Sequence, residues 1–149
     1  MRLMGLDLGE KTIGISVSDE LGLTAQPRTT LKRISKVKDI ACLLDIAKEN
    51  SVTGIVVGMP INMDGSRGEA AKKAEGFISR LQENTSLPVI SWDERLSTAA
   101  VTRVLVSADM SRAKRKAHVD KLAAAYILQG YLDSLKSVTP YHPPFTKGD

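Results

Sequence analysis

Three acidic segments contain the residues of this chain best suited to chemistry. Asp7 interrupts an apolar, strand-like run at residues 4–8, and the glycine that follows, Gly9, can take positive φ in a turn. Burying an unpaired carboxylate is expensive, so an acid at the end of a central strand needs a cation, a metal ion or a hydrogen-bond donor as its partner. Alternatively, Asp7 caps the turn toward Glu10 and Lys11.

The second acidic segment is Asp93-Glu94, which follows a short apolar run ending at Trp92. Side chains alternate between the two faces of an extended chain, so only one of these acids can face Asp7 directly. We favour Glu94, which has the longer reach, and keep Asp93 as its substitute. Alternatively, Glu94 pairs with Arg95 or lies at the N-terminus of the next helix, where the helix dipole favours negative charge.

The third acid, Asp120, lies in the last predicted helix. The residues three, four, seven, eight and eleven positions later would form one buried helix face: Ala123, Ala124, Ile127, Leu128 and Tyr131. Asp120 therefore begins a stripe that faces the core. An ion pair with Lys116, four residues earlier, is the alternative explanation of this carboxylate.

If the three acids converge, they need bound cations. Carboxylates within about 4 Å of one another repel by several kcal/mol each, even at an effective dielectric constant near 20. Hard oxygen ligands suit Mg²⁺ or Mn²⁺. Two such ions can activate a water molecule and stabilise the leaving oxygen in phosphodiester hydrolysis, so we expect a pair of Mg²⁺ or Mn²⁺ ions here.

Four cations stand just before and at the start of the last predicted helix: Arg112, Lys114, Arg115 and Lys116. The helix dipole disfavours positive charge at this end, so we expect phosphate contacts near Asp120; a solvated loop is the alternative. His118 is two residues from Asp120, roughly on the opposite helix face, and is expected to be a surface contact and not a metal ligand.

Further substrate contacts are expected from Asn62, Arg67 and Arg95. Asn62 and Arg67 bound a Gly-containing loop after a buried strand, placed either to contact substrate or to cap the next helix. Aromatic residues make up only 4% of the chain, so base stacking of the kind used by single-strand binders is not supported.

Hydrophobic periodicity predicts strands at residues 2–8, 12–18, 23–32, 53–60 and 87–92, and helices at 36–50, 67–83, 97–106 and 116–136. The first two strands form a hairpin, and Pro27 suits an edge or a bulge in the third. This order predicts an α/β fold with a mixed five-stranded sheet flanked by helices, its first three strands antiparallel. Sites in such sheets gather at the carboxyl ends of strands, where Asp7 and Glu94 both lie.

Length and composition favour one domain over residues 1–138 and a loose, Pro-rich tail over 139–149. The single cysteine, Cys42, is expected to be a buried thiol. A net charge of +4 is mild evidence for a polyanionic partner. No apolar run approaches the roughly 20 residues that cross a bilayer, and the N-terminus lacks a signal pattern, so a cytoplasmic protein is expected.

The chain resembles the YqgF/RuvX family of small bacterial proteins, relatives of the RuvC Holliday-junction resolvases. The resemblance spans residues 3 to about 135 and rests on four segments: Gly5-Leu6-Asp7-Leu8-Gly9, VGMPINMDGS at 57–66, DERLST at 93–98 and DKLAAAYIL at 120–128. It implies an RNase H-like three-layer fold and a nuclease that processes the 5′ end of pre-16S rRNA. It also implies that Asp7, Glu94 and Asp120 bind the metal. Many RNase H-like nucleases add a fourth acid one turn from the last; here those positions hold Ala117 and Ala123.

Other functions stay open at this stage. The chain could resolve branched DNA, or bind nucleic acid or ribosomal precursor particles without cleaving. The Asp7-Leu8-Gly9 hairpin also resembles the phosphate-binding start of actin-like ATPases and sugar kinases, but those enzymes bind nucleotide between two such domains and this chain has the length of one. Neither RNA versus branched DNA nor monomer versus homodimer is decided by the residues.

Overall fold

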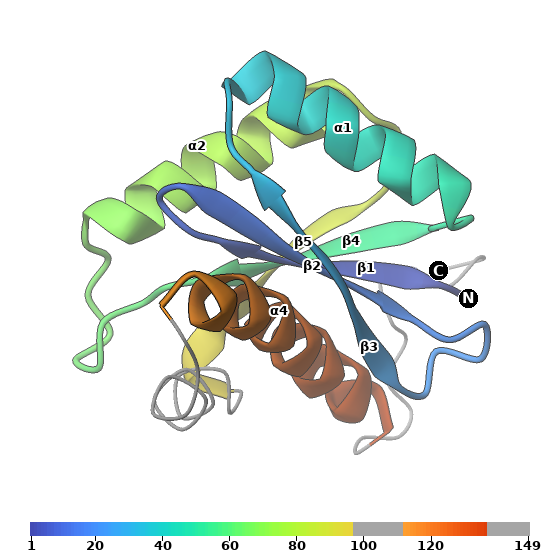
Figure 1. The fold of residues 1–149 in the computed structure, drawn as a ribbon. Coiled ribbons are helices and arrows are strands. Elements are labelled where there is room, and N and C mark those ends of the chain that lie inside the picture. The colour runs from blue at the N-terminus through green and yellow to red at the C-terminus, as the bar shows by residue number, and fades with distance from the viewer. Residues whose placement is uncertain (97–111, 137–149) are drawn as a thin grey trace.

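Five strands form one mixed sheet in the order β3-β2-β1-β4-β5 (Figure 1). The computed structural model describes residues 1–96 and 112–136, with the backbone alone at 112–118. Its elements are β1 (Leu3–Leu8), β2 (Thr12–Ser18), β3 (Ala25–Lys32), α1 (Lys36–Glu49), β4 (Gly54–Met59), α2 (Glu69–Glu83), β5 (Val89–Asp93), a 3-10 turn η1 (Glu94–Leu96) and α4 (Arg112–Lys136). Strands β1 to β3 pair antiparallel, and β4 and β5 pair parallel to β1 and β4. The predicted fold class is confirmed.

Several element boundaries differ from the prediction by one or two residues, and the start of α4 differs by four. Helix α4 begins at Arg112, four residues before the predicted start, because Arg, Lys and Ala have high helix propensity and carry the helix through the basic segment. Strand β5 runs on to Asp93, which is paired with Met59 of β4. The predicted helix at 97–106 and the tail at 139–149 lie outside the described residues. Within the described part of the chain, no helix is long and apolar enough to cross a membrane.

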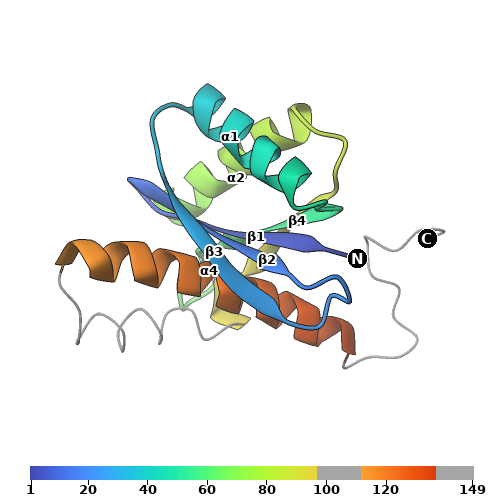
Figure 2. The ribbon, with the colours of Figure 1, turned by 45° about the vertical axis from the view of Figure 1, so that its right-hand side comes forward.

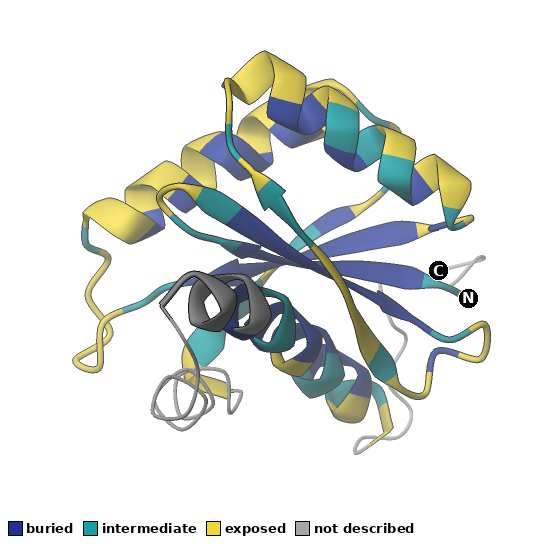
Figure 3. Cartoon of the chain, in the orientation of Figure 1, coloured by how far each residue is buried: buried dark blue, intermediate teal, exposed yellow. Residues whose placement is uncertain are grey.

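Helices cover both faces of the sheet (Figure 2): α1 and α2 lie on one, α4 on the other. Alternation along β1 sends Met4 and Leu6 toward α1 and α2, and Leu3 toward α4. Strands β1, β2 and β4 are the most continuously buried part of the molecule, whereas β3 is largely exposed (Figure 3). Asp7 has the same parity as Leu3, so its carboxylate lies on the α4 face. Cys42 is half-buried, and not fully buried as expected, because it lies at the side of the buried stripe of α1.

Glycines let α4 approach the sheet closely. A Cβ atom on Gly5 would lie 2.7 Å from Cβ of Leu128 and 2.9 Å from the carbonyl oxygen of Ala124. A Cβ atom on Gly14 would overlap the backbone carbonyl of Asp120. The buried hydroxyl of Ser16 donates to the carbonyl oxygen of Ala124 at 2.8 Å, which fixes the depth of the helix. Helix α4 therefore crosses β1 and β2 at positions without side chains.

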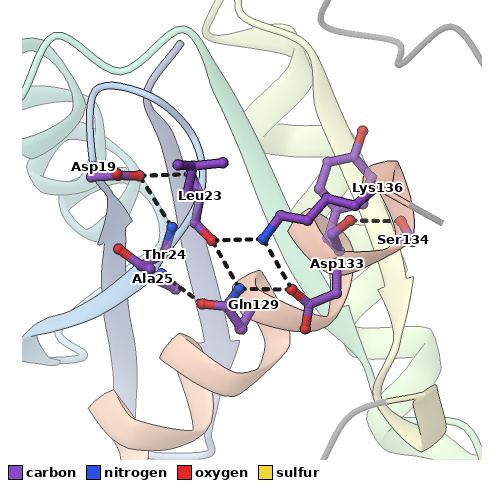
Figure 4. Close-up of polar contacts among 9 residues, drawn as sticks. Asp19, Leu23, Thr24, Ala25, Gln129, Asp133, Ser134 and Lys136 are labelled. Carbon is purple, nitrogen blue, oxygen red and sulfur yellow. Dashed lines mark hydrogen bonds and ion pairs between the residues drawn. The ribbon is translucent and has the colours of Figure 1, made fainter.

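The C-terminal half of α4 is tied to the turn between β2 and β3 (Figure 4). The side-chain amide of Gln129 accepts from the backbone N–H of Ala25 at 2.9 Å and donates to the carbonyl oxygen of Leu23 at 3.0 Å. Lys136 donates to the same Leu23 oxygen at 3.2 Å. These contacts resist rotation of α4 about its axis and so help to hold Asp120, near its other end, in one direction.

The β1–β2 turn differs from the prediction in its backbone. Gly9 does not have positive φ; among the glycines of the described residues only Gly22 and Gly65 do. Instead, the N–H of Gly9 donates to the carbonyl oxygen of Thr12 at 2.8 Å, and a Cβ atom there would lie 2.8 Å from that oxygen. Gly9 is thus explained by close approach. Pro27 lies on the edge strand at a register shift, as predicted.

Substitution of Gly14 tests the close packing of α4. We expect Gly14→Ala to lower the free energy of unfolding by about 1–3 kcal/mol or more, because the added methyl overlaps the backbone of α4. Urea unfolding measures this. The matched control is Gly76→Ala in α2, where nothing lies within 4 Å of the added Cβ. It should stabilise by about 0.5–1 kcal/mol. Equal effects of the two substitutions would contradict the packing described here.

Candidate active site

Asp7 lies near the carboxyl end of the central strand β1, on the α4 face and between two glycines. It is paired with Gly14 of β2, and the pairing of Leu6 with Val57 makes Asp7 the neighbour of Gly58 on β4. Only 5% of Asp7 is exposed. Because neither flanking residue has a side chain, the space beside the carboxylate is open to groups from α4 and from the end of β5.

Asp120 reaches the same place from α4. Its backbone carbonyl lies directly over Gly14, the residue paired with Asp7. The hydroxyl of Thr12, at the start of β2, donates a hydrogen bond to Oδ2 of Asp120. Asp120 is 4% exposed. Together with its position over Gly14, this places two buried carboxylates, Asp7 and Asp120, in the same region although they are 113 positions apart in the sequence.

Glu94 lies on the other side of Asp7. Its Cγ atom is 3.1 Å from the position that a Cβ on Gly58 would occupy, which places Glu94 on the α4 face. Asp93, one residue earlier, is bound by Arg95: Nη2 lies 2.7 Å from Oδ2, and Nε lies 3.0 and 3.1 Å from the two oxygens. Of the two adjacent acids, Glu94 thus lies on the α4 face beside Gly58, and Asp93 is paired with Arg95.

The Asp93–Arg95 pair also joins two segments of the chain. The hydrogen bond from the Arg95 side chain holds the pKa of the Asp93 carboxyl below its ordinary value, and Asp93 in turn raises the pKa of Arg95. A second contact runs from Nη1 of Arg95 to the carbonyl oxygen of Asn62 at 3.4 Å. Arg95 therefore holds the end of β5 against the loop that follows β4.

That loop is organised by its own polar groups. The side chain of Asn62 donates to Oγ of Ser66 at 3.0 Å, and Ser66 donates to Oδ1 of Asp64 through its N–H at 2.9 Å and its hydroxyl at 2.6 Å. The hydroxyl of Ser66 is the main cause of the lowered pKa of Asp64. Gly65, with φ +87°, allows the chain to reverse. The sequence analysis did not predict that Asp64 and Ser66 hold this loop together. The Asp-x-Ser spacing, which is typical of an Asx turn, could have indicated it.

The predicted nucleic-acid contacts occupy different surroundings. Arg67 donates to Glu75 at 2.6 Å and its side chain is 55% exposed, while the Arg95 side chain is 35% exposed. The remaining basic residues are in the first turns of α4 and not in a loop: Arg112, Lys114, Arg115 and Lys116. Their side chains and that of His118 lie outside the described residues.

The acids offer oxygen ligands of the kind that Mg²⁺ and Mn²⁺ prefer. Asp7 and Asp120 are buried on one face, and a side chain at Gly58 would block the space toward Glu94. Among the side chains that the structure describes, no three acids, histidines or cysteines lie close enough to hold one ion. The donor set fits hard divalent ions. Of the two positions for a fourth acid, Ala123 is fully buried in the core, and the side chain of Ala117 is not described.

Comparison with known proteins identifies the family. Residues 1–134 match the family model RuvX, described as Holliday junction resolvase. The chain belongs to this family. A protein of Myxococcus xanthus named "Putative pre-16S rRNA nuclease" is 52% identical over 144 residues, 96% of this chain and 95% of the relative. A relative of the same name from Symbiobacterium thermophilum is 53% identical over 140 residues, 94% of this chain and 97% of the relative.

Solved structures show the same fold at low identity. RuvC of Thermus thermophilus in complex with a Holliday junction substrate has a TM-score of 0.57 at 14% identity, covering 93% of this chain and 98% of RuvC. The fowlpox virus Holliday junction resolvase has a TM-score of 0.51 at 16% identity, covering 91% and 99%. The RNase H-like fold of RuvC-like proteins is thereby confirmed.

The RuvX protein is a nuclease, and thus a hydrolase that acts on nucleic acid. RuvC-like nucleases in general use divalent metal ions. Family membership across residues 1–134 favours this activity over the actin-like ATPase and the non-catalytic module considered from the sequence.

The Asp93–Arg95 pair makes a prediction about pH. Because the folded-state pKa of Asp93 is lowered, the pair stabilises the protein above the ordinary Asp pKa near 3.9, and this contribution is lost as pH falls through the lowered value. Asp93→Asn should therefore cost up to about 1 kcal/mol near neutral pH, and the difference from wild type should vanish in strong acid.

Denaturant unfolding across this pH range measures the effect. Glu75→Gln is the control, since it removes a carboxylate from a more exposed Arg pair and should stay near wild type at every pH. A deficit of Asp93→Asn that is the same at neutral and acid pH would show that side-chain shape, and not charge, is responsible.

Proposed function

We propose that this RuvX protein is a metal-dependent endonuclease that cleaves structured RNA, with the 5′ end of precursor 16S rRNA as its substrate. One observation carries the proposal: Asp7 and Asp120, both about 95% buried, meet at Gly14 on the face covered by α4, where Asp7 is its cross-strand neighbour and the backbone of Asp120 lies over it. The choice of substrate is supported by the shared name of relatives about half identical over nearly the whole chain.

In this proposal Asp7, Glu94 and Asp120 hold two Mg²⁺ or Mn²⁺ ions, and Asp93 is a substitute ligand only when Arg95 releases it. Such ions would supply an activated water and charge stabilisation at the leaving oxygen. The protein's part is to hold its carboxylates in place. Thr12 fixes one oxygen of Asp120, and burial of Asp7 and Asp120 keeps competing water from both.

The substrate contacts come from two sides of this site. Arg112, Lys114, Arg115 and Lys116 precede Asp120 by one to two turns of α4 and contact phosphates. On the β4–β5 side, the side chains of Arg67 and Arg95 are partly exposed beside their carboxylate partners. Asn62 acts mainly by holding the loop, since its amide donates to Ser66.

Branched DNA is the second candidate substrate, favoured by the description of the matching family as a Holliday junction resolvase. A resolvase that cuts both strands symmetrically needs a twofold dimer, whereas cleavage of precursor rRNA does not. The rRNA proposal places the protein in the cytoplasm with ribosomal precursor particles.

The Asp7→Asn variant tests the catalytic assignment. It should abolish cleavage of precursor rRNA while the fold persists, because it removes a negative ligand and keeps the shape of the side chain. Without metal its melting temperature should equal or exceed that of wild type, since repulsion between carboxylates is relieved. Gel-based cleavage with Mg²⁺ or Mn²⁺ and a thermal melt measure these two quantities.

The same assay on a four-way DNA junction separates the candidate substrates. Preferential cleavage of the junction would replace the rRNA proposal by the resolvase. Full activity of Asp7→Asn on either substrate would sink the catalytic assignment. The control Asp45→Asn removes an exposed carboxylate of α1 and should cleave like wild type.

Replacing Arg112, Lys114 and Arg115 together with Ala tests the basic start of α4. Binding of structured RNA should weaken regardless of sequence, and the log–log dependence of affinity on salt should flatten by up to roughly 0.7–0.9 per lost contact. Fluorescence anisotropy across a salt series measures this. An unchanged salt slope would assign these residues to solvated surface.

A further inference from the structure

A second basic feature lies on the opposite face of the sheet from Asp120. It is a hollow of about 830 Å³ between the β1–β2 turn, the end of β3, the start of α1 and the first half of α2. We call it the basic hollow. Its cations come from all four of these elements: Lys11, Lys32, Arg33, Lys36, Lys72 and Lys73.

The charge of the hollow is strongly unbalanced. The lining contains six cations and two acids, Glu10 and Asp39. Its net charge is therefore +4, equal to that of the whole chain. Asp39 is buried and is already committed: Oδ1 accepts from the N–H of Ile34 at 2.9 Å, and Oδ2 lies 3.6 Å from Nε of Arg33. One exposed acid therefore faces five lysines.

Arg33 differs from the other cations of the basic hollow because its guanidinium is bound by neighbouring groups of the protein. Its Nη1 donates to the carbonyl oxygen of Gly9 at 2.8 Å, and its guanidinium lies 5.5 Å from the ring centroid of Phe77. In contrast, all five lysines are exposed, and within the described residues none forms an ion pair. Like charges gathered without partners destabilise the folded protein, which a bound polyanion would reverse.

The position of the hollow connects it to the acidic site. Its lining begins at Leu8, the residue after Asp7, about 3.8 Å away along the chain. The β1–β2 turn forms the rim between the two faces of the sheet. A strand held at Asp7 can thus pass over this turn and reach the lysines without crossing the core.

We propose that the basic hollow binds the phosphate backbone of the nucleic-acid substrate beyond the site of cleavage, an inference that rests on the proposed nuclease function. Three features favour a backbone over a small anion or a stacked base. The volume far exceeds that of one phosphate, lysines act as point charges that suit several phosphates, and the aromatic ring of Phe77 is 2% exposed and unavailable for stacking.

The test compares paired charge removals. Lys72→Gln/Lys73→Gln removes two charges from the hollow, and the control Lys38→Gln/Lys48→Gln removes two exposed charges of α1 outside its lining. Binding of a fluorescein-labelled RNA hairpin with a single-stranded extension is measured in EDTA across a salt series. We expect the hollow variant to bind at least about tenfold more weakly at 0.1 M salt and to lose roughly 1.4–1.8 of salt slope. The control should stay near wild type.

Further arms decide what each outcome means. Lys72→Arg/Lys73→Arg keeps the charge and should restore binding. Equal losses of RNA affinity in the hollow variant and in the control would overturn the inference. Pyrophosphate binding is measured in the same variants. If the hollow variant loses pyrophosphate binding but binds RNA like wild type, the hollow is a small-anion site and the inference is also overturned. Because EDTA removes cleavage from this assay, the two proposals fail separately. Wild type that cleaves no substrate defeats the nuclease proposal alone, and a hollow variant that matches its control defeats this one alone.

Discussion

The close contact between α4 and the β1–β2 hairpin is the constraint on which the site depends. The helix comes near enough for a Cβ on Gly14 to overlap the carbonyl of Asp120, and the same glycine is paired with Asp7. One backbone contact thus sets how deep the helix lies and how far apart the two carboxylates are. Ser16 and Gln129 hold the helix at that depth and rotation. A looser fit would separate acids that the metal ions must draw together.

The pattern of strands and helices could be read from the chain because it is local. Residues 12–18 and the edge position of Pro27 were predicted as they are found, since alternation and a missing N–H act within a few residues. The buried position of Asp120 follows from its helical stripe, whereas the choice of Glu94 over Asp93 as a metal ligand stays a prediction. These are statements about the periodicity of single elements.

The features of the site that the sequence does not predict depend on contacts between distant segments of the chain. Thr12 and Asp120 are 108 residues apart, and no spacing rule links a strand-start hydroxyl to that carboxylate. The same holds for Arg95, whose partner could have been either adjacent acid; the end of β5 at Asp93 decides it. The hollow is assembled from four elements, so its lysines appear in the sequence as unrelated surface charges. The start of α4 was misplaced because intrinsic propensity outweighed the dipole.

The edge strand β3 has a consequence for the behaviour of the protein at high concentration. Such strands offer unpaired backbone groups to other chains, and β3 is exposed over most of its length. Pro27 interrupts its row of N–H groups, the register shift opposite Ser16 disturbs its flatness, and Arg28 and Lys32 repel a second copy. The β3 edge of the sheet therefore makes a poor template for intermolecular β-pairing, which protects this edge against aggregation.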